Sequence, residues 1–256
     1  MLAQWIKVAV VIYVGLCGFL FLVQRNLLYY PQPGSMNRSA EMTMVQPDGT
    51  SILVTTRFLD GPEAVIYFGG NAEDVTDSLP DFSAVFRGRS LYLMNYRGYG
   101  GSGGSPSEQT LFADAIALYD RISQVHPRVT VIGRSLGSAV AIKLASERPV
   151  TQLVLVTPFD SVQNIAASQF PYLPVRLLLR DKFESWRYAP QVRAPTRVLA
   201  AANDNVVPLK RTGALLEHFP PYAVTLKVVE GADHNSIASD PRYLDWLAAP
   251  PNVSLD

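Results

Sequence analysis

The chain contains a serine, an aspartate and a histidine in the sequence order that is typical of one class of nucleophilic catalysts. Ser135 lies between Gly133 and Gly137 in "VTVIGRSLGSAVAIKLA", and Gly-x-Ser-x-Gly is the spacing of a serine nucleophile on a sharp strand-to-helix turn. The turn strains the serine backbone, and the glycines tolerate it because they have no side chains to clash. A serine hydroxyl becomes a good nucleophile only when a base takes its proton and a carboxylate orients that base. The sequence must therefore supply both partners.

The base is predicted to be His234. The chain has three histidines, and in proteins with this turn the nucleophile comes first, then the acid, then the histidine. His126 precedes Ser135, so the order excludes it. His218 has the position of a surface residue at the end of a helix. His234 follows the apolar run "LKVVEGAD" in a loop, where the base is expected.

The orienting carboxylate is predicted to be Asp204. It is the only acidic residue in "NDNVVP", the loop after the preceding strand candidate. The alternative role for Asp204 is to cap a helix that begins near Pro208. Asp233 is the reserve candidate, although its position next to His234 makes an orienting contact to the imidazole awkward.

Backbone amides near these residues are predicted to form an oxyanion hole, which stabilises the charge that develops on the attacked carbonyl. One donor is the N–H of Leu136, the residue after the nucleophile. The second is expected in "GGNAED", directly after the strand candidate "AVIYF". We choose the N–H of Asn71, with Ala72 close behind. The other interpretation of this segment is an ordinary strand-to-helix turn.

A second glycine-rich segment, "NYRGYGGSGGSPSE" at 95–108, offers competing motifs. Gly98, Gly100 and Gly103 have the spacing of a dinucleotide-binding loop. That loop needs a helix immediately after it and an acidic residue about 20 residues on, at the end of the next strand, and the sequence has neither. Ser102 also lies in a Gly-x-Ser-x-Gly spacing, but we expect a floppy loop that cannot hold one attack geometry. The glycines are predicted to let the chain turn sharply.

The elements around these residues predict an α/β fold. The strand candidates are nearly all apolar, as in parallel strands that are covered on both faces: "AVIYFGG", "LYLMNY", "VTVIG", "LVLVTPF", "RVLAAAN" and "LKVVEGAD". Helical patterns alternate with them, and one helix is expected to begin at Pro106, with Ser105 as N-cap and Glu108 closing a capping box. A hairpin around Pro-Asp-Gly precedes them. We predict a mostly parallel, doubly wound sheet with an N-terminal antiparallel hairpin and ligand-binding loops at the carboxyl ends of its strands.

The N-terminal segment is predicted to be a transmembrane anchor over residues 1–24, followed by one catalytic domain over 25–256. The apolar run from Val8 to Val23 approaches the roughly 20 residues that span a bilayer. The alternative is a cleaved signal peptide, whose apolar region is usually shorter and is followed by a small-x-small site that this chain lacks. The short segment before the run weakly favours a cytoplasmic amino terminus and an exported catalytic domain.

Composition argues against several other classes. The 22 basic and 22 acidic side chains give a net charge of zero, without the basic face that nucleic-acid binding needs. One cysteine excludes internal disulfides and cysteine-rich metal sites, and three histidines argue against a multi-histidine metal centre. The oligomeric state is not determined by the sequence.

Taken in order, these segments resemble a known superfamily. The chain is similar to membrane-anchored serine hydrolases of the α/β-hydrolase superfamily, the relatives of monoacylglycerol lipases and acyl-protein thioesterase-like proteins, in "QRNLLYYP", "FGGNAEDV", "NYRGYGGSGGSPSE", "VIGRSLGSAVA", "VTPFDSV", "YLPVRLLLRDKFES", "NDNVVP" and "GADHNSI". The resemblance implies hydrolysis of carboxylic esters or thioesters by Ser135, Asp204 and His234, without cofactor or metal. The chain departs from the superfamily in having Phe-Gly-Gly at 68–70, where relatives commonly have His-Gly.

An apolar excursion over residues 157–190 separates the sixth and seventh expected strands. The resemblance implies that such an insertion covers the active site, so it is interpreted as an acyl-binding cap near the membrane. The alternative is a helix packed on the core with Arg176 and Arg180 solvated. The expected substrate is a small-molecule or lipid-like acyl compound. Two further hypotheses are a serine peptidase of the prolyl-peptidase type and a non-catalytic membrane-anchored scaffold.

Overall fold

A mixed β-sheet forms the centre of the protein, whose computed structural model describes residues 1–34, 41–221 and 223–250. Its strands are β1 (Glu41–Val45), β2 (Ser51–Arg57), β3 (Glu63–Phe68), β4 (Ser90–Met94), β5 (Arg128–Arg134), β6 (Gln152–Val156), β7 (Thr196–Ala201) and β8 (Val224–Val229). The described residues arrange them in the order β1-β2-β4-β3-β5-β6-β7-β8. β2 pairs antiparallel with both β1 and β4, and the remaining pairs are parallel. The predicted sheet and its N-terminal hairpin are confirmed.

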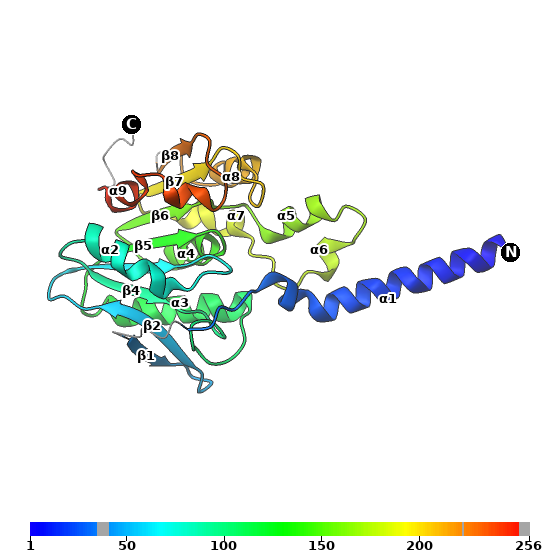
Figure 1. The fold of residues 1–256 in the computed structure, drawn as a ribbon, viewed down its shortest axis with the longest axis horizontal. Coiled ribbons are helices and arrows are strands. Elements are labelled where there is room, and N and C mark those ends of the chain that lie inside the picture. The colour runs from blue at the N-terminus through cyan, green and yellow to red at the C-terminus, as the bar shows by residue number, and fades with distance from the viewer. Residues whose placement is uncertain (35–40, 222, 251–256) are drawn as a thin grey trace.

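Helices cover both faces of this sheet (Figure 1). The helices of the described residues are α1 (Leu2–Leu28), which does not cover the sheet, α2 (Leu79–Val85), α3 (Glu108–Ile122), α4 (Leu136–Glu147), α5 (Val162–Gln169), α6 (Val175–Leu178), α7 (Ser185–Tyr188), α8 (Leu209–Leu216) and α9 (Tyr243–Ala248), with short 3-10 turns η1 (Val75–Ser78), η2 (Ala189–Gln191) and η3 (Ser236–Ser239). Successive strand residues point to opposite faces. In β3, Ile66 and Phe68 therefore join the core under α3 and α4, whereas Val65 and Tyr67 join the core under α2 and α9.

The helix α3 begins later than the sequence indicated. Its N-cap is Ser107, whose hydroxyl accepts a hydrogen bond from the Thr110 amide at 3.2 Å, while the Thr110 hydroxyl accepts one from the Ser107 amide at 3.0 Å. The prediction of Ser105 as N-cap is wrong because α3 begins at Glu108, so that Thr110 and not Glu108 occupies the third helical position and completes the capping box. The Glu108 carboxylate instead accepts a hydrogen bond from the Lys182 amide at 2.7 Å.

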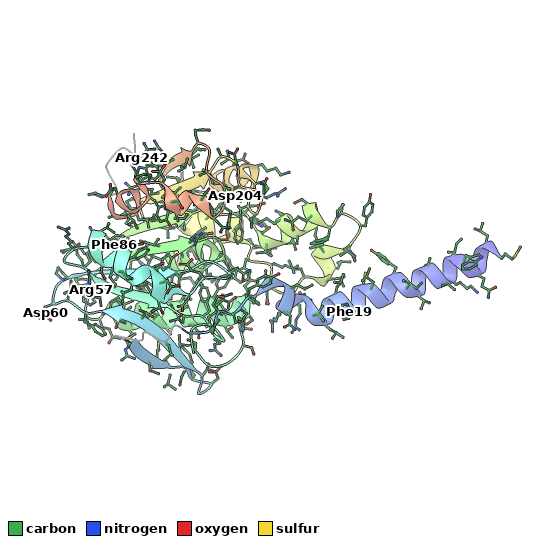
Figure 2. The ribbon with its side chains drawn as sticks, in the orientation of Figure 1. Phe19, Arg57, Asp60, Phe86, Asp204 and Arg242 are labelled. Carbon is green, nitrogen blue, oxygen red and sulfur yellow. The ribbon has the colours of Figure 1, made fainter. Side chains whose placement is uncertain are left out.

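The helix α1 projects away from the body of the protein, and α5 and α6 lie on the side from which it leaves (Figure 1). It has 27 residues, a mean hydropathy of 2.5 in its most apolar window, and only 6% of that window buried. Side chains such as Phe19 point outward along it (Figure 2). A mostly exposed apolar N-terminal helix is therefore present, and it continues to Leu28, past the predicted end of the anchor at residue 24.

Candidate active site

Ser135 lies on the sharp turn between β5 and α4. Its backbone has φ 49° and ψ −116°, a conformation that residues with a side chain rarely adopt. Its amide donates to the carbonyl oxygen of Val156 at 2.9 Å, which fixes the turn to the neighbouring strand β6. Its carbonyl accepts hydrogen bonds from the amide and the hydroxyl of Ser138 at 2.9 and 2.6 Å. The hydroxyl of Ser135 is thus held at the carboxyl end of the sheet.

The two flanking glycines make this turn possible because other backbone lies against them. A Cβ at Gly133 would overlap the carbonyl of Gly137, and a Cβ at Gly137 would overlap the carbonyls of Phe68 and Gly69. The first turn of α4 therefore lies directly against the end of β3. This close approach brings the amide of Leu136 next to the loop that follows β3.

His234 and Asp204 meet Ser135 from two other loops. The Nε2 of His234 lies 2.9 Å from the Oγ of Ser135, and its Nδ1 lies 2.7 Å from Oδ2 of Asp204. A carboxylate only accepts hydrogen bonds, so Nδ1 carries the proton and a neutral ring directs the lone pair of Nε2 at the serine hydroxyl. The three side chains can therefore pass a proton from serine to imidazole.

Asp204 is held in place by its own loop. Its Oδ1 accepts hydrogen bonds from the amides of Val206 and Val207 at 2.9 and 2.6 Å, before α8 begins, which leaves Oδ2 for His234. The carboxylate thus both orders the turn before α8 and contacts the imidazole. Its side chain is only 2% exposed, so solvent does not compete for these contacts.

The remaining candidates for base and acid lie elsewhere. His126 is buried and hydrogen-bonds the hydroxyl of Tyr92 and the carbonyl of Gly61, and His218 is exposed at the end of α8. Asp233 is exposed, and hydrogen bonds from the amides and side chains that follow it, first from Ser236, hold its pKa below the usual range. Asp233 caps the turn that leads into η3.

The loop after β3 presents a free amide to the pocket at Ser135. The backbone amides of Asn71 and Leu136 donate no hydrogen bond to any other group of the described residues. The neighbouring amide of Gly70 is occupied, since it donates to Oε2 of Glu73 at 2.8 Å. Asn71 and Leu136 both line the pocket beside Ser135, whereas Ala72 does not. The geometry therefore favours Asn71 over Ala72 as the second donor.

Two side chains that the sequence reasoning missed hold this loop. Glu73 accepts hydrogen bonds from Tyr67 at 2.6 Å and from Arg134 at 3.2 Å as well as from Gly70. The Tyr99 hydroxyl donates to the carbonyl of Asn71 at 2.8 Å and accepts from the amide of Tyr30 at 3.0 Å. Burial raises the pKa of Tyr99 to about 12, so this hydroxyl keeps its proton. The sequence could have indicated Glu73, because it is an acidic residue shortly after Gly69 and Gly70. No sequence spacing indicates that Tyr99 contacts this loop.

The glycine-rich segment at 95–108 is a firmly bonded structural loop. The hydroxyl of Ser102 accepts from the Leu53 amide and donates to the Asn95 carbonyl, both at 2.9 Å. Arg97 pairs with Asp114 through two hydrogen bonds of 2.8 and 2.9 Å. The expected floppy loop is wrong, because Ser102 is buried and its hydroxyl is fixed by one donated and one accepted hydrogen bond. Its proton is given to the Asn95 carbonyl and not to a base, which agrees with its exclusion as a nucleophile.

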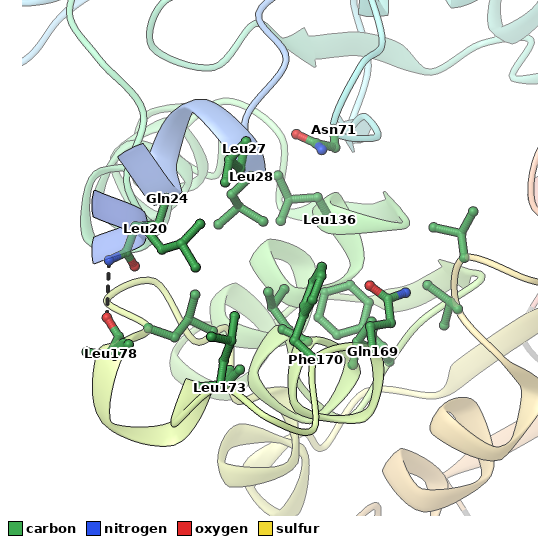
Figure 3. A pocket seen from close by; sticks show the side chains of 18 of the residues that line it. Leu20, Gln24, Leu27, Leu28, Asn71, Leu136, Gln169, Phe170, Leu173 and Leu178 are labelled. Carbon is green, nitrogen blue, oxygen red and sulfur yellow. Dashed lines mark hydrogen bonds between the residues drawn. The ribbon is translucent and has the colours of Figure 1, made fainter. Parts of the chain in front are cut away.

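An apolar pocket of about 570 Å³ opens at Ser135. Figure 3 shows Leu27 and Leu28 of α1 on one side, Phe170 and Leu173 of the excursion on the other, and Asn71 and Leu136 at one end. This volume lies in the usual range for ligand sites. Sequence reasoning found the excursion but missed the wall from α1. Among the described residues, no group of three or more histidine, cysteine or acidic side chains is arranged to hold a metal ion.

Comparisons with known proteins show which proteins this chain is similar to. A family model described as serine aminopeptidase, S33, matches residues 80–188. The chain is 36% identical to an uncharacterized protein of Mycobacterium tuberculosis over 254 residues, which cover 90% of this chain and 86% of that protein. It is 27% identical to the protein bem46 of Schizosaccharomyces pombe over 75% of this chain and 73% of that protein. A solved esterase from Pyrococcus furiosus has a similar fold, with a TM-score of 0.65 and 18% identity over 86% of this chain and 93% of that chain.

These findings place the chain in the α/β-hydrolase superfamily. Within it, the chain belongs to the same family as the mycobacterial protein, which it matches over nearly the full length of both.

Proposed function

We propose that the protein is a serine hydrolase that cleaves carboxylic esters or thioesters of acylated or lipid-like compounds. The observation that carries this proposal is the contact of 2.9 Å between the Ser135 hydroxyl and the imidazole of His234 at one end of an apolar pocket. The hydroxyl is the nucleophile, the imidazole the base, and Asp204 the group that orients it.

The reaction proceeds through an acyl-enzyme. Oγ of Ser135 attacks the acyl carbonyl while Nε2 of His234 takes its proton. The oxyanion accepts hydrogen bonds from the amides of Asn71 and Leu136, and the Leu136 amide has the added field of the N-terminus of α4. The imidazolium returns its proton to the leaving alcohol or thiol. Water then attacks the ester of Ser135 with the same base, which releases the acid and frees the hydroxyl.

The apolar helix α1 is proposed to be an uncleaved, single-pass membrane anchor, with the catalytic domain on the exported side. Its length and composition suit a bilayer. Against a cleaved signal peptide, its last turns line the pocket, and Arg25 forms hydrogen bonds of 2.7 and 3.0 Å with Asp181 of the excursion. Cleavage after residue 24 would remove Leu20 and Phe21 from the pocket lining, and with Gln24 it would remove the hydrogen bonds to the excursion.

A serine peptidase is the second candidate, because the family model that matches residues 80–188 describes an aminopeptidase. Hydrolysis of p-nitrophenyl esters and of peptide p-nitroanilides by the purified protein separates the two. We expect the esters to be cleaved and the anilides to remain intact, because the pocket at Ser135 offers apolar surface and few polar groups for a peptide backbone. Faster cleavage of the anilides would favour the peptidase.

A further inference from the structure

The end of the membrane helix forms one wall of the substrate pocket. Leu20, Phe21, Gln24, Leu27 and Leu28 of α1 line the same pocket as Ser135. From Leu20 to Leu28 this wall runs for ~12 Å along the helix axis. An acetyl group does not need such a length of apolar wall, whereas an extended acyl chain does.

Polar contacts hold α1 against the excursion on the opposite side of this pocket. The Gln24 amide group donates to the carbonyl of Leu178 at 3.1 Å and accepts from the amide of Arg180 at 2.7 Å. Nearer the N-terminus, the hydroxyl of Tyr13 donates to the carbonyl of Tyr172 at 2.7 Å. At the other end of this series of contacts, Arg25 forms an ion pair with Asp181 at 2.7 Å. The helix and the excursion therefore form one unit with the pocket between them.

The tip of the excursion, residues 170–177, lies beside the part of α1 that is apolar and exposed. Tyr13 precedes Arg25 by twelve residues, so the contact at Tyr172 lies ~18 Å further along the helix. The hydrocarbon core of a bilayer is about 30 Å thick, and the excursion exposes Phe170, Tyr172 and Leu177 at 53, 89 and 84%. Such large apolar side chains suit contact with lipid.

The outer end of the pocket lies at this tip. Phe21 and Phe170 both line the pocket and are themselves exposed, and Arg180 lies over the ring of Phe21 at 5.7 Å. The pocket thus runs from Ser135 to the part of the surface that the bilayer would cover. An acyl chain that enters there exchanges one apolar environment for another and does not cross water.

We propose that the protein takes the acyl chain of its substrate directly from the lipid bilayer, through the opening between α1 and the tip of the excursion. This inference rests on the proposed function and specifies its substrate as a membrane-resident lipid with a long acyl chain. The head group with the scissile ester follows the chain inward until its carbonyl reaches Ser135.

The route is tested with the full-length protein in phosphatidylcholine vesicles. A fluorogenic stearoyl ester is placed either in the same bilayer as the protein or in separate protein-free vesicles mixed with it. Long chains leave a bilayer slowly, since each buried methylene adds to the free energy of desorption. We therefore expect hydrolysis at least about tenfold faster when protein and ester share a bilayer. Equal rates in the two arrangements would overturn the route.

Two tryptophan substitutions on α1 test the wall itself. Leu20→Trp narrows the outer end of the pocket, and the control Leu22→Trp lies on the same helix with a side chain that is 79% exposed and outside the pocket. We expect the ratio of stearoyl to acetyl ester hydrolysis to fall roughly tenfold in Leu20→Trp, as when about two methylenes lose their burial, and to stay at the wild-type value in Leu22→Trp. An equal ratio in all three proteins, or an equal fall in both variants, contradicts the proposal.

The acetyl ester separates this inference from the proposed function. If the wild-type protein hydrolyses the acetyl ester in water but shows no preference for lipid in its own bilayer, only the route fails. If it hydrolyses neither ester, the proposed function fails and the route fails with it.

Discussion

At the scale of single residues, Asp204 shows how one side chain can both order its own loop and contact the proposed catalytic base. One of its oxygens accepts two backbone amides before α8, and the other contacts His234. The helix-cap alternative for Asp204 is wrong, because α8 begins at Leu209 without a side-chain cap and the amides that Asp204 binds lie in the turn before it.

The variant Asp204→Asn tests the orienting role. An amide can donate to Nδ1 of His234, which favours the wrong tautomer and removes the lone pair of Nε2 from Ser135. We expect kcat for a p-nitrophenyl ester to fall about 10⁴-fold while the far-UV circular dichroism stays that of the wild type. Asp233→Asn is the matched control and is expected to retain activity within a factor of two or so, because surface changes are small in effect. A comparable loss in both variants would mean that Asp204 has no special role.

Tyr99 is expected to act as a positioning residue for the oxyanion loop. Tyr99→Phe removes the hydroxyl that joins the Tyr30 amide to the Asn71 carbonyl. Small displacements of a catalytic donor have large effects on the rate, so kcat should fall roughly tenfold with KM little changed. Tyr119→Phe loses a comparable hydrogen bond to the Pro149 carbonyl, and neither residue lines the pocket at Ser135, so this variant should leave kcat intact. Equal kcat values in the two variants would disprove the positioning role.

At the scale of elements, the turn between β5 and α4 depends on glycine at 137. A Cβ there would overlap the carbonyls of Phe68 and Gly69. Gly137→Ala should therefore reduce the free energy of unfolding by about 1–3 kcal/mol, as overpacking does, and should reduce activity by moving the Leu136 amide. Chemical denaturation and ester hydrolysis measure the two effects.

Gly213→Ala in α8 is the matched control for this substitution. A Cβ at Gly213 has no atom within 4 Å, and alanine is favoured over glycine in a helix interior by about 1 kcal/mol. This variant should be slightly more stable than the wild type. A Gly137→Ala protein as stable as Gly213→Ala would show that the close approach of α4 to β3 is not essential.

Helices and strands could be predicted where the sequence pattern of neighbouring residues determines them. The strands from β3 to β7 are short, apolar and buried on both faces, so their positions follow from composition alone. The predicted start of α3 was wrong because Ser105 and Glu108 have the usual capping-box spacing, whereas in the structure Thr110 closes the box with Ser107 and Glu108 binds the Lys182 amide. The rigidity of the loop around Ser102 was missed for a similar reason: its partners, Leu53 and Asn95, are not recognisable from glycine spacing.

At the scale of the whole molecule, α1 is part of the candidate active site and not only an attachment to the domain that carries it. Its last turns line the pocket, and Arg25 pairs with the buried Asp181. Sequence reasoning predicted an apolar helix and an apolar excursion separately, but it could not place them against each other. Their contacts span more than 150 positions of the chain, and no local pattern encodes such pairing.

Because α1 lines the pocket, we expect the mature protein to retain this helix. Protein isolated from membranes should have the mass of the full chain from Met1, and alkaline carbonate should not extract it, because an apolar span of this length is inserted stably. A mature mass that begins after residue 24 would show that the segment is a signal peptide.

Labelling by a fluorophosphonate probe tests the nucleophile, on which all the other proposals depend. The probe reacts with a serine hydroxyl only when a neighbouring base activates it. We predict that the full-length protein is labelled, that Ser102→Ala is labelled equally when it folds, and that Ser135→Ala is not labelled at all. A folded wild-type protein that takes up no probe, or a Ser135→Ala protein that still does, would contradict the account.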